Sequence, residues 1–216
     1  MVIEMKLYYG ANDLIIKPVF GKGNPSNDYG LGFYLTPEYD MAVLWASKFR
    51  NNGYAITYEV DLSSMNVLYL NSSSKEDVLK WITLLVSHRF SRDEYEKYKA
   101  QIEWLKKTYS IAIDNYDMIV GYRADDSYFK YSEEFVNNNL SLELLKKAME
   151  IGKLGLQYVL ISKKAFNSIK YISHAKVDHT EEYERFRLKT LQEYNNLREQ
   201  DSINNTFIRD IMRENK

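Results

Sequence analysis

Residues 28–46 hold the side chains whose types and spacing are best suited to ligand binding in this chain. Gly30 and Gly32 flank a single residue, and a backbone without Cβ atoms at these positions can bend sharply or lie against a flat ligand. Tyr34 follows at the end of a short apolar strand, where its aromatic face can stack on a ring. The same pattern also fits an ordinary strand–turn–helix unit, so this segment alone names no ligand.

A helix is expected directly after this strand. Thr36 is predicted to be its N-cap and Pro37 its first helical residue. Met41, Leu44 and Trp45 then recur at helical spacing and predict the face that packs on the core. Strand, turn and helix should therefore follow one another within about twenty residues.

Cysteine and histidine offer little further chemistry. The chain has no cysteine, which excludes disulfides and thiolate catalysis, and only three histidines. His174 and His179 are close in sequence, but no acidic or cysteine motif accompanies them, so we expect no metal site. The net charge of −1 gives no electrostatic reason to expect nucleic-acid binding.

The length and the hydrophobic pattern bound the class of protein. A chain of 216 residues is long enough for one large domain, or for one domain with a helical appendage. It contains no apolar run long enough to span a bilayer, and its first residues lack a basic segment followed by an apolar stretch. We therefore expect a cytoplasmic protein without a membrane partner.

The order of apolar patterns predicts an α+β fold, with a strand-rich frame and helices inserted between and after its strands. Expected strands are residues 3–9, 54–61, 66–70, 118–122 and 156–162, of which the last is the best candidate for a central strand. Expected helices cover about 141–151, 180–195 and 201–214, and two more begin at the capping patterns around Ser73 and Ser91, the second running through Tyr109.

Three segments resemble, in this order, the motifs of ADP-ribosyltransferases of the diphtheria-toxin and poly(ADP-ribose) polymerase type. They are Leu-Tyr-Tyr-Gly at 7–10, Gly-Leu-Gly-Phe-Tyr-Leu-Thr at 30–36 and Gln-Tyr-Val-Leu at 157–160. The second segment, together with Ala-Asp-Asp at 124–126, is similar to a bacterial family of uncharacterised domains within that superfamily. The resemblance covers about residues 5–172.

The resemblance implies a split antiparallel β-sheet that clasps NAD, which is the substrate. It places Tyr9 and Gly10 at the nicotinamide amide and a ribose, Tyr34 against the nicotinamide ring, and Gln157 at the nicotinamide-ribose 2′-hydroxyl. Further contacts to NAD are expected from Tyr8, Gly32, Thr36, Arg123 and Asp125. The domain would span residues 1–175, with a helical insertion at about 74–112, and a C-terminal helical extension would cover 176–216.

Two residues depart from the usual pattern of that superfamily. Tyr9 replaces a histidine, so it can donate to a ribose hydroxyl but cannot carry a positive charge. Gln157 replaces a glutamate, so it can bond a hydroxyl but cannot neutralise an oxocarbenium-like transition state or act as a base. Because departure of nicotinamide builds positive charge on the ribose, another anion near it is expected.

Asp125 and Asp126 are the candidates for that anion, and Asp126 is favoured because Asp125 can cap the segment that follows. The alternative is that both belong to a plain turn. Glu59, on the polar side of a strand, is a second candidate. Arg123 can contact a pyrophosphate or pair with a neighbouring acid, and the sequence does not decide between them.

The sequence thus leaves three hypotheses. The first is an NAD-dependent mono-ADP-ribosyltransferase or NAD-cleaving relative, with a protein, a nucleic-acid base or water as acceptor. By analogy it would act as a bacterial toxin, with an antitoxin as partner, or in phage conflict. The second is a module that binds NAD or ADP-ribose without turnover, because Gln157 replaces the acid. The third is an interaction protein that binds a partner or a second copy through residues 180–214.

Overall fold

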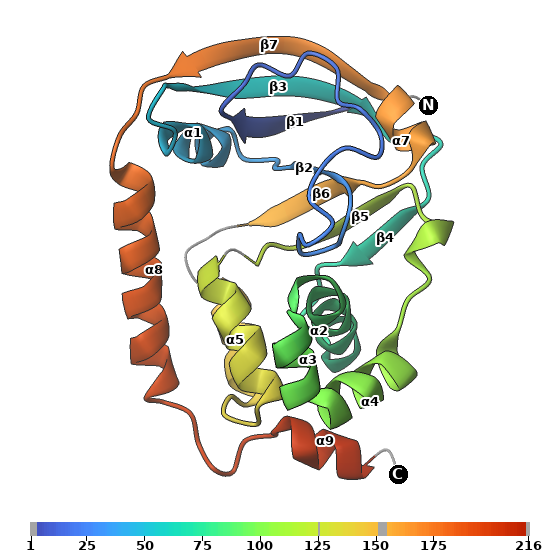
Figure 1. Cartoon of the computed structure of the whole chain (residues 1–216), viewed down its shortest axis with the longest axis vertical. Coiled ribbons are helices and arrows are strands. Elements are labelled where there is room, and N and C mark those ends of the chain that lie inside the picture. Colours follow the sequence, from blue (N-terminus) through green and yellow to red (C-terminus); the bar gives the residue numbers. More distant parts are fainter. Residues whose placement is uncertain (1–3, 125, 151–154, 215–216) are drawn as a thin grey trace.

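The computed structural model describes residues 4–124, 126–150 and 155–214, and the side chains of 126–129 and 150 lie outside that description. Strands gather into two sheets, and most helices lie together beyond the second sheet (Figure 1). This arrangement confirms the predicted α+β class.

The first sheet has three antiparallel strands in the order β1-β3-β7, with bounds β1 (Glu4–Ala11), β3 (Gly53–Asp61) and β7 (Ile169–Val177). The first two are expected from the sequence, whereas β7 is not. β7 is an edge strand with mostly exposed residues, and a register shift opposite Thr57 and Tyr58 leaves Ile172 without a partner in the ladder. The period-two pattern that would reveal such a strand is therefore interrupted.

The second sheet has the order β2-β6-β5-β4, with bounds β2 (Phe33–Leu35), β6 (Leu156–Leu160), β5 (Met118–Tyr122) and β4 (Val67–Leu70). Its interior position confirms β6 as a central strand. The sheet is mixed, because β4 runs parallel to β5, and the expectation of a purely antiparallel sheet is wrong at this pair. A parallel pair needs a long crossover, and residues 71–117 supply it.

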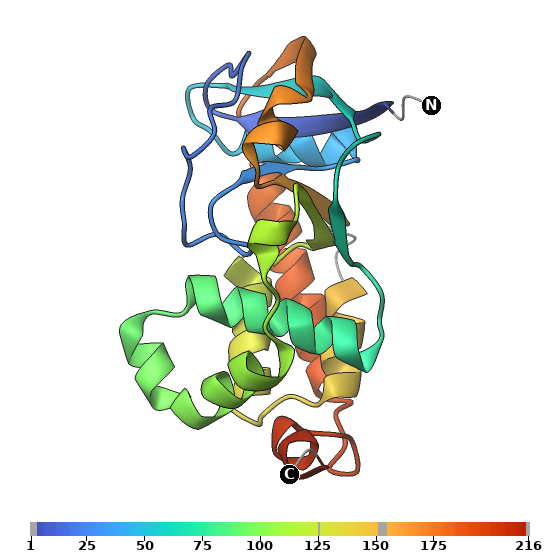
Figure 2. The ribbon, with the colours of Figure 1, turned by 90° about the vertical axis from the view of Figure 1, so that its right-hand side faces the viewer.

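That crossover contains α2 (Lys75–Arg89), α3 (Arg92–Lys97), α4 (Lys99–Tyr109) and a 3₁₀ turn, η1 (Ile113–Asn115). Ser74, rather than Ser73, caps α2 by accepting from the Asp77 amide. Ser91 and Glu94 form the predicted capping box of α3. The helix expected to continue through Tyr109 is divided at Tyr98 into α3 and α4, which project from the body of the molecule (Figure 2).

The remaining helices are α1 (Tyr39–Ser47), α5 (Asp126–Val136), α6 (Leu142–Glu150), α7 (Lys163–Asn167), α8 (Glu182–Arg198) and α9 (Ile208–Glu214). The sequence pattern does not predict α5, which begins in a segment that resembles a turn, or α7, which is a single short turn of helix. The start of α9 is at Ile208 rather than near 201, and α1 starts at Tyr39 with Glu38 as its N-cap rather than at Pro37.

Thr36 does not cap α1, because its backbone belongs to the junction of the two sheets. Tyr8 and Thr36 exchange two backbone hydrogen bonds, of 2.8 and 2.9 Å, which link β1 to the end of β2. The Thr36 hydroxyl accepts from the Glu38 amide and turns the chain toward α1. From this junction the two sheets diverge.

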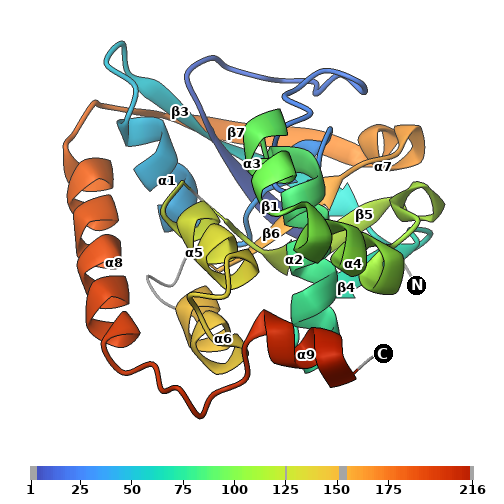
Figure 3. The same cartoon turned by 60° about the horizontal axis from the view of Figure 1, so that its bottom comes forward.

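Helix α8 runs from the end of β7 past α1 to α5 and α6 (Figure 3). It is anchored in the core by Tyr194, which is fully buried, stacks on Tyr131 at 3.6 Å between ring centroids and donates to the Glu134 carboxylate. Residues beyond 175 therefore contribute to the same core as the helices of the crossover.

Candidate functional site

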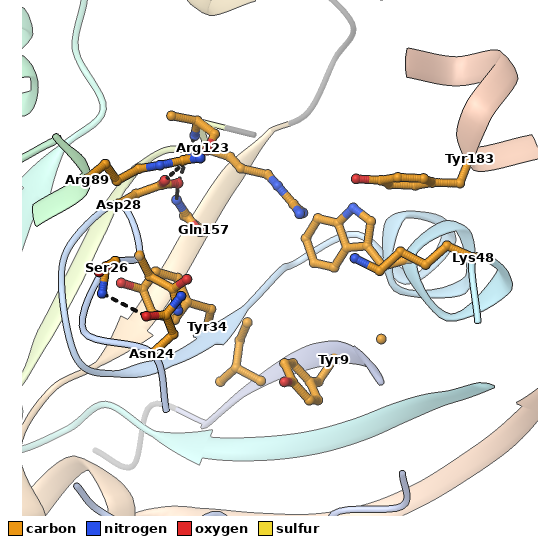
Figure 4. A pocket seen from close by; sticks show the side chains of 15 residues that line it. Tyr9, Asn24, Ser26, Asp28, Tyr34, Lys48, Arg89, Arg123, Gln157 and Tyr183 are labelled. Atoms are coloured by element: carbon orange, nitrogen blue, oxygen red, sulfur yellow. Dashed lines mark hydrogen bonds and ion pairs between the residues drawn. The ribbon is translucent and has the colours of Figure 1, made fainter. Parts of the chain in front are cut away.

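A cavity of about 400 Å³ lies where the two sheets diverge (Figure 4). Its walls include five residues singled out in the sequence: Tyr9, Gly10, Tyr34, Arg123 and Gln157. Its walls also include Asp28, Trp45, Lys48, Arg89 and Tyr183, which the sequence does not mark as site residues. The volume lies within the range of small-molecule sites.

Asp28 is the centre of a buried polar network in one wall of this cavity. One carboxylate oxygen accepts from the Arg89 guanidinium at 2.8 Å. The other accepts from the Ala124 amide at 2.9 Å and from the Gln157 side-chain amide at 2.8 Å. Arg89 also donates to the Ala124 carbonyl at 2.6 Å. The network ties together the loop before β2, the end of α2, the chain after β5 and the start of β6.

The turn that carries Asp28 is held in place at several points. The Gly30 amide donates to the Asn27 carbonyl, and Gly30 has a φ of +76°, a conformation that favours glycine. The buried Tyr29 hydroxyl donates to the Tyr122 carbonyl at 2.7 Å. Gly121 leaves room for that hydroxyl, since an added Cβ would lie 2.2 Å from it.

Tyr34 lines the cavity with its ring and fastens the same turn with its hydroxyl. The hydroxyl donates to the Gly30 carbonyl at 2.6 Å and accepts from the Tyr29 amide at 3.1 Å. Burial raises the pKa of Tyr34, so the hydroxyl stays protonated at neutral pH. The ring is thus held in one orientation beside the cavity.

Tyr9 and Gly10 form the wall contributed by β1. The Tyr9 ring packs on Phe33 at 4.7 Å between centroids, and burial raises the pKa of its hydroxyl. That hydroxyl makes no hydrogen bond with any residue in the described part of the chain. A Cβ at Gly10 would lie 2.3 Å from the Ala42 carbonyl oxygen and 2.8 Å from the Trp45 Cβ. The glycine is therefore required by the close packing of α1 on β1.

Arg123 and Lys48 form a cationic part of the cavity wall. The Arg123 guanidinium carbon lies 3.4 Å from the centroid of the Trp45 ring, a cation–π contact that orients the guanidinium. The Nζ of Lys48, the C-cap residue of α1, lies 5.2 Å from the centroid of the Tyr183 ring of α8 (Figure 4). Trp45 is 8 % exposed, so it belongs to the core as expected and also forms part of the cavity wall.

Several predicted site residues lie away from these walls. Tyr8 and Thr36 join the two sheets, and Gly32 borders a second cavity of about 450 Å³ that also includes Lys163 and Tyr116. A Cβ at Gly32 would meet the Val159 side chain at 2.6 Å, so sheet packing accounts for this glycine. None of these three residues is among the described residues that line the first cavity.

The predicted anions are placed as follows. Asp125 lies outside the described residues, as does the side chain of Asp126, although Ala124 just before them lines the cavity. Glu59 lies on β3, 3.8 Å from Lys170, and is not among the residues of the cavity wall. Among the described residues, the acid that lines the cavity is Asp28, two positions before the motif at 30–36.

Two further findings concern metals and membranes. Among residues 4–124, 126–150 and 155–214, no group of three histidine or acidic side chains is arranged to hold a metal ion. None of the helices in that part of the chain is both long and apolar enough to cross a membrane.

The fold and this cavity define the class: a mixed α+β protein with a cation-rich cavity between two diverging sheets. Residues 5–171 match the family model described as "Protein of unknown function (DUF3990)", and the chain belongs to this family. No curated protein and no solved structure matches the chain.

Proposed function

We propose that this protein binds NAD in the cavity between its two sheets and transfers ADP-ribose from it to an acceptor. The observation that carries the proposal is that Tyr9, Tyr34 and Gln157, which are far apart in the sequence, line one cavity. The resemblance to ADP-ribosyltransferases assigns NAD contacts to these same three positions. If the likeness of the three separate motifs were due to chance, nothing would require these residues to meet in one cavity.

The charges of the cavity fit a dinucleotide. Its described walls contain three cations, Lys48, Arg89 and Arg123, and one anion, Asp28. Arg89 pairs with Asp28, and cationic side chains outnumber anionic ones among the described wall residues, which suits an anionic ligand. Arg123 presents a planar guanidinium, and such a group matches pyrophosphate oxygens well. The aromatic faces of Tyr34 and Tyr9 suit a ring and a ribose.

The proposed reaction breaks the bond between the ribose C1′ and the nicotinamide nitrogen. The electron pair of that bond leaves with nicotinamide, and positive charge develops on the ribose. A nucleophile on the acceptor then forms a new bond to C1′ and gives its proton to solvent or to a nearby base. With water as the nucleophile the product is free ADP-ribose. The chain's contribution is to hold the nicotinamide end against Tyr34 and the ribose beside Gln157.

A second candidate function is NAD or ADP-ribose binding without turnover. It is favoured by the side chain at position 157, because an amide lacks the charge of the acid usually found there. It is also favoured by Asp28, whose charge is already paired with Arg89. Both functions require the same cavity, and they differ only in the release of nicotinamide.

Incubation of the protein with NAD, with and without cell lysate, tests both functions. Nicotinamide release or transfer of labelled ADP-ribose supports the transferase. A rise in melting temperature with NAD, without nicotinamide release, supports the binding module. Tyr34→Ala should abolish either effect, whereas Tyr116→Ala, at a tyrosine of the second cavity, should not. An absence of both NAD effects in the wild-type protein would overturn the proposal.

The proposed cellular setting follows only from the resemblance. It is that of a bacterial cytoplasmic effector, a toxin or a phage-conflict protein, with a macromolecular acceptor and an antitoxin or second copy as partner. Residues 180–214 were the predicted partner surface, but Tyr183 on α8 lines the cavity and Tyr194 is buried. At least part of α8 therefore serves the fold and the cavity.

A further inference from the structure

Gln157 is 4 % exposed, and its amide is oriented by acceptors. The Nε2 group lies 2.8 Å from an Asp28 carboxylate oxygen and 3.5 Å from the Tyr122 carbonyl oxygen. An ionised carboxylate and a backbone carbonyl can only accept hydrogen bonds, so the amide must turn its N–H groups toward them. The amide oxygen, Oε1, accepts no hydrogen bond from any residue of the described chain, and Gln157 lines the cavity.

Asp28 is itself fixed independently of Gln157. Arg89 holds one of its oxygens, and the Ala124 amide holds the other. The carboxylate is 9 % exposed and cannot turn away without breaking the ion pair. Asp28 is therefore a rigid reference to which the Gln157 amide is attached.

Resting on the proposed function, we propose that Asp28 is a positioning residue that makes Gln157 present its amide oxygen to a hydroxyl of the ligand ribose. A hydroxyl donates to Oε1, and Oε1 carries partial negative charge toward the ribose carbon from which nicotinamide leaves. The hydrogen bond to Asp28 polarises the amide and increases that negative charge. Gln157 and Asp28 together then supply what a glutamate at position 157 would supply alone.

Exchanging the carboxylate at position 28 and the amide at position 157 tests this arrangement. Asp28→Asn removes the charge and allows an amide at 28 to face the amide at 157. We expect nicotinamide release to fall by roughly tenfold or more, the size of one lost charge-assisted hydrogen bond. The double variant Asp28→Asn/Gln157→Glu restores a donor and an acceptor between positions 28 and 157 in reversed order, with an oxygen at position 157 again free to face the ribose, although the Ala124 amide loses its acceptor. It should recover at least part of the lost activity.

A readout without ligand comes from Gln157→Glu alone. It brings two carboxylates into contact beside a single Arg89, so one of them binds a proton more tightly in the folded than in the unfolded chain. Its melting temperature should therefore fall relative to wild type as pH rises from 5 to 8. The double variant should not show this loss. Asp117→Asn, at a carboxylate with several donors far from the cavity, controls for general effects on the fold.

The outcomes separate the two proposals. Wild-type activity in Asp28→Asn, or a folded double variant with no recovery, overturns the positioning role while NAD cleavage stands. If the melting temperatures of Gln157→Glu and wild type depend on pH in the same way, the side chains at positions 28 and 157 are not in contact. If the wild-type protein neither binds nor cleaves NAD, the proposed function fails, and the ligand role of Gln157 fails with it. If the wild-type protein binds NAD without cleaving it, the loss and recovery are measured as NAD affinity.

Discussion

The side-chain amide of Gln157 donates to the Asp28 carboxylate at 2.8 Å, although 129 positions separate the two residues. The contact joins Gln157, the second residue of β6, to the turn that precedes β2. It also explains how a buried carboxylate is tolerated, since Arg89 and the Ala124 amide donate to the same group. Removal of any of these donors should have a measurable cost.

The first prediction concerns the ion pair. Arg89→Met should lower the free energy of unfolding by about 3 kcal/mol, because it leaves the Asp28 carboxylate buried without its cation. Chemical denaturation measures the difference. Arg92→Met, at an exposed arginine of α3, should change stability by less than about 0.5 kcal/mol. Equal stabilities of the two variants would show that Arg89 and Asp28 are not paired in solution.

The second prediction separates the ring of Tyr34 from its hydroxyl. Tyr34→Phe keeps the aromatic face but leaves the Tyr29 amide without its acceptor, so stability should fall by about 1–2 kcal/mol. NAD binding should fall much less than in Tyr34→Ala. Tyr109→Phe is the matched control, since its hydroxyl makes no hydrogen bond with a described residue. If Tyr34→Phe were as stable as this control, the Tyr34 hydroxyl would not hold the turn at Tyr29 and Gly30.

The third prediction concerns two glycines with nearly equal, positive φ angles. Gly30 has φ +76° and Gly21 has φ +79°, and alanine is strained by about 1–2 kcal/mol at either. At Gly21 an added Cβ meets nothing within 4 Å, whereas at Gly30 it lies 2.7 Å from the His88 ring. Gly30→Ala should therefore be the less stable variant by thermal denaturation. Equal losses would mean that His88 moves aside without cost.

Local patterns predicted those elements whose signal lies in residues that are neighbours in the sequence. The apolar segment that forms β6 and the capping box of α3 are examples, because each depends on neighbours in the sequence. The edge strand β7 lacks such a pattern because most of its residues are exposed. The start of α1 was misplaced because the backbone of Thr36 is paired with Tyr8, a residue 28 positions earlier in the chain.

The residues of the candidate site were likewise predicted only in part. Tyr34 and Gly10 were marked by motifs, but Asp28 and Arg89 were not, although Asp28 lies only two positions before the motif at 30–36. Arg89 reaches the cavity from the end of α2 in the crossover, and Tyr183 reaches it from α8. Which helix ends approach the cavity depends on packing between distant elements. A search for an acid beside the marked segments, rather than only after β5 and on β3, would have found Asp28.

The fourth prediction tests the cationic wall. Arg123→Met should weaken NAD binding by roughly tenfold, because it removes a charge-assisted contact to the pyrophosphate. Arg123→Lys should recover only part of the affinity, since lysine keeps the charge but lacks the flat guanidinium that packs on Trp45. Calorimetric titration with NAD measures both. Lys163→Met, in the second cavity, should bind as wild type. A similar loss in that control would indicate a general effect of net charge.

The fifth prediction is a loss of stability at high pH. Burial raises the pKa of Tyr34, and that of Tyr29, above the ordinary value of 10.0. Above pH 10 the unfolded chain releases these protons while the folded chain keeps them, so the unfolded state binds fewer protons and stability falls as pH rises. The slope is at most about 1.4 kcal/mol per pH unit for each tyrosine.

Melting temperatures between pH 8 and 11 measure this loss, and Tyr34→Phe isolates one contribution. At pH 8 the melting temperature of this variant should be lower than that of wild type, because the variant lacks the hydroxyl that bonds Tyr29 and Gly30. The gap should narrow toward pH 11, because the variant has one tyrosine fewer to deprotonate on unfolding. Exposed lysines titrate in both proteins and cancel in the comparison. A gap that stays constant across this range would mean that the Tyr34 hydroxyl is not buried in the folded protein.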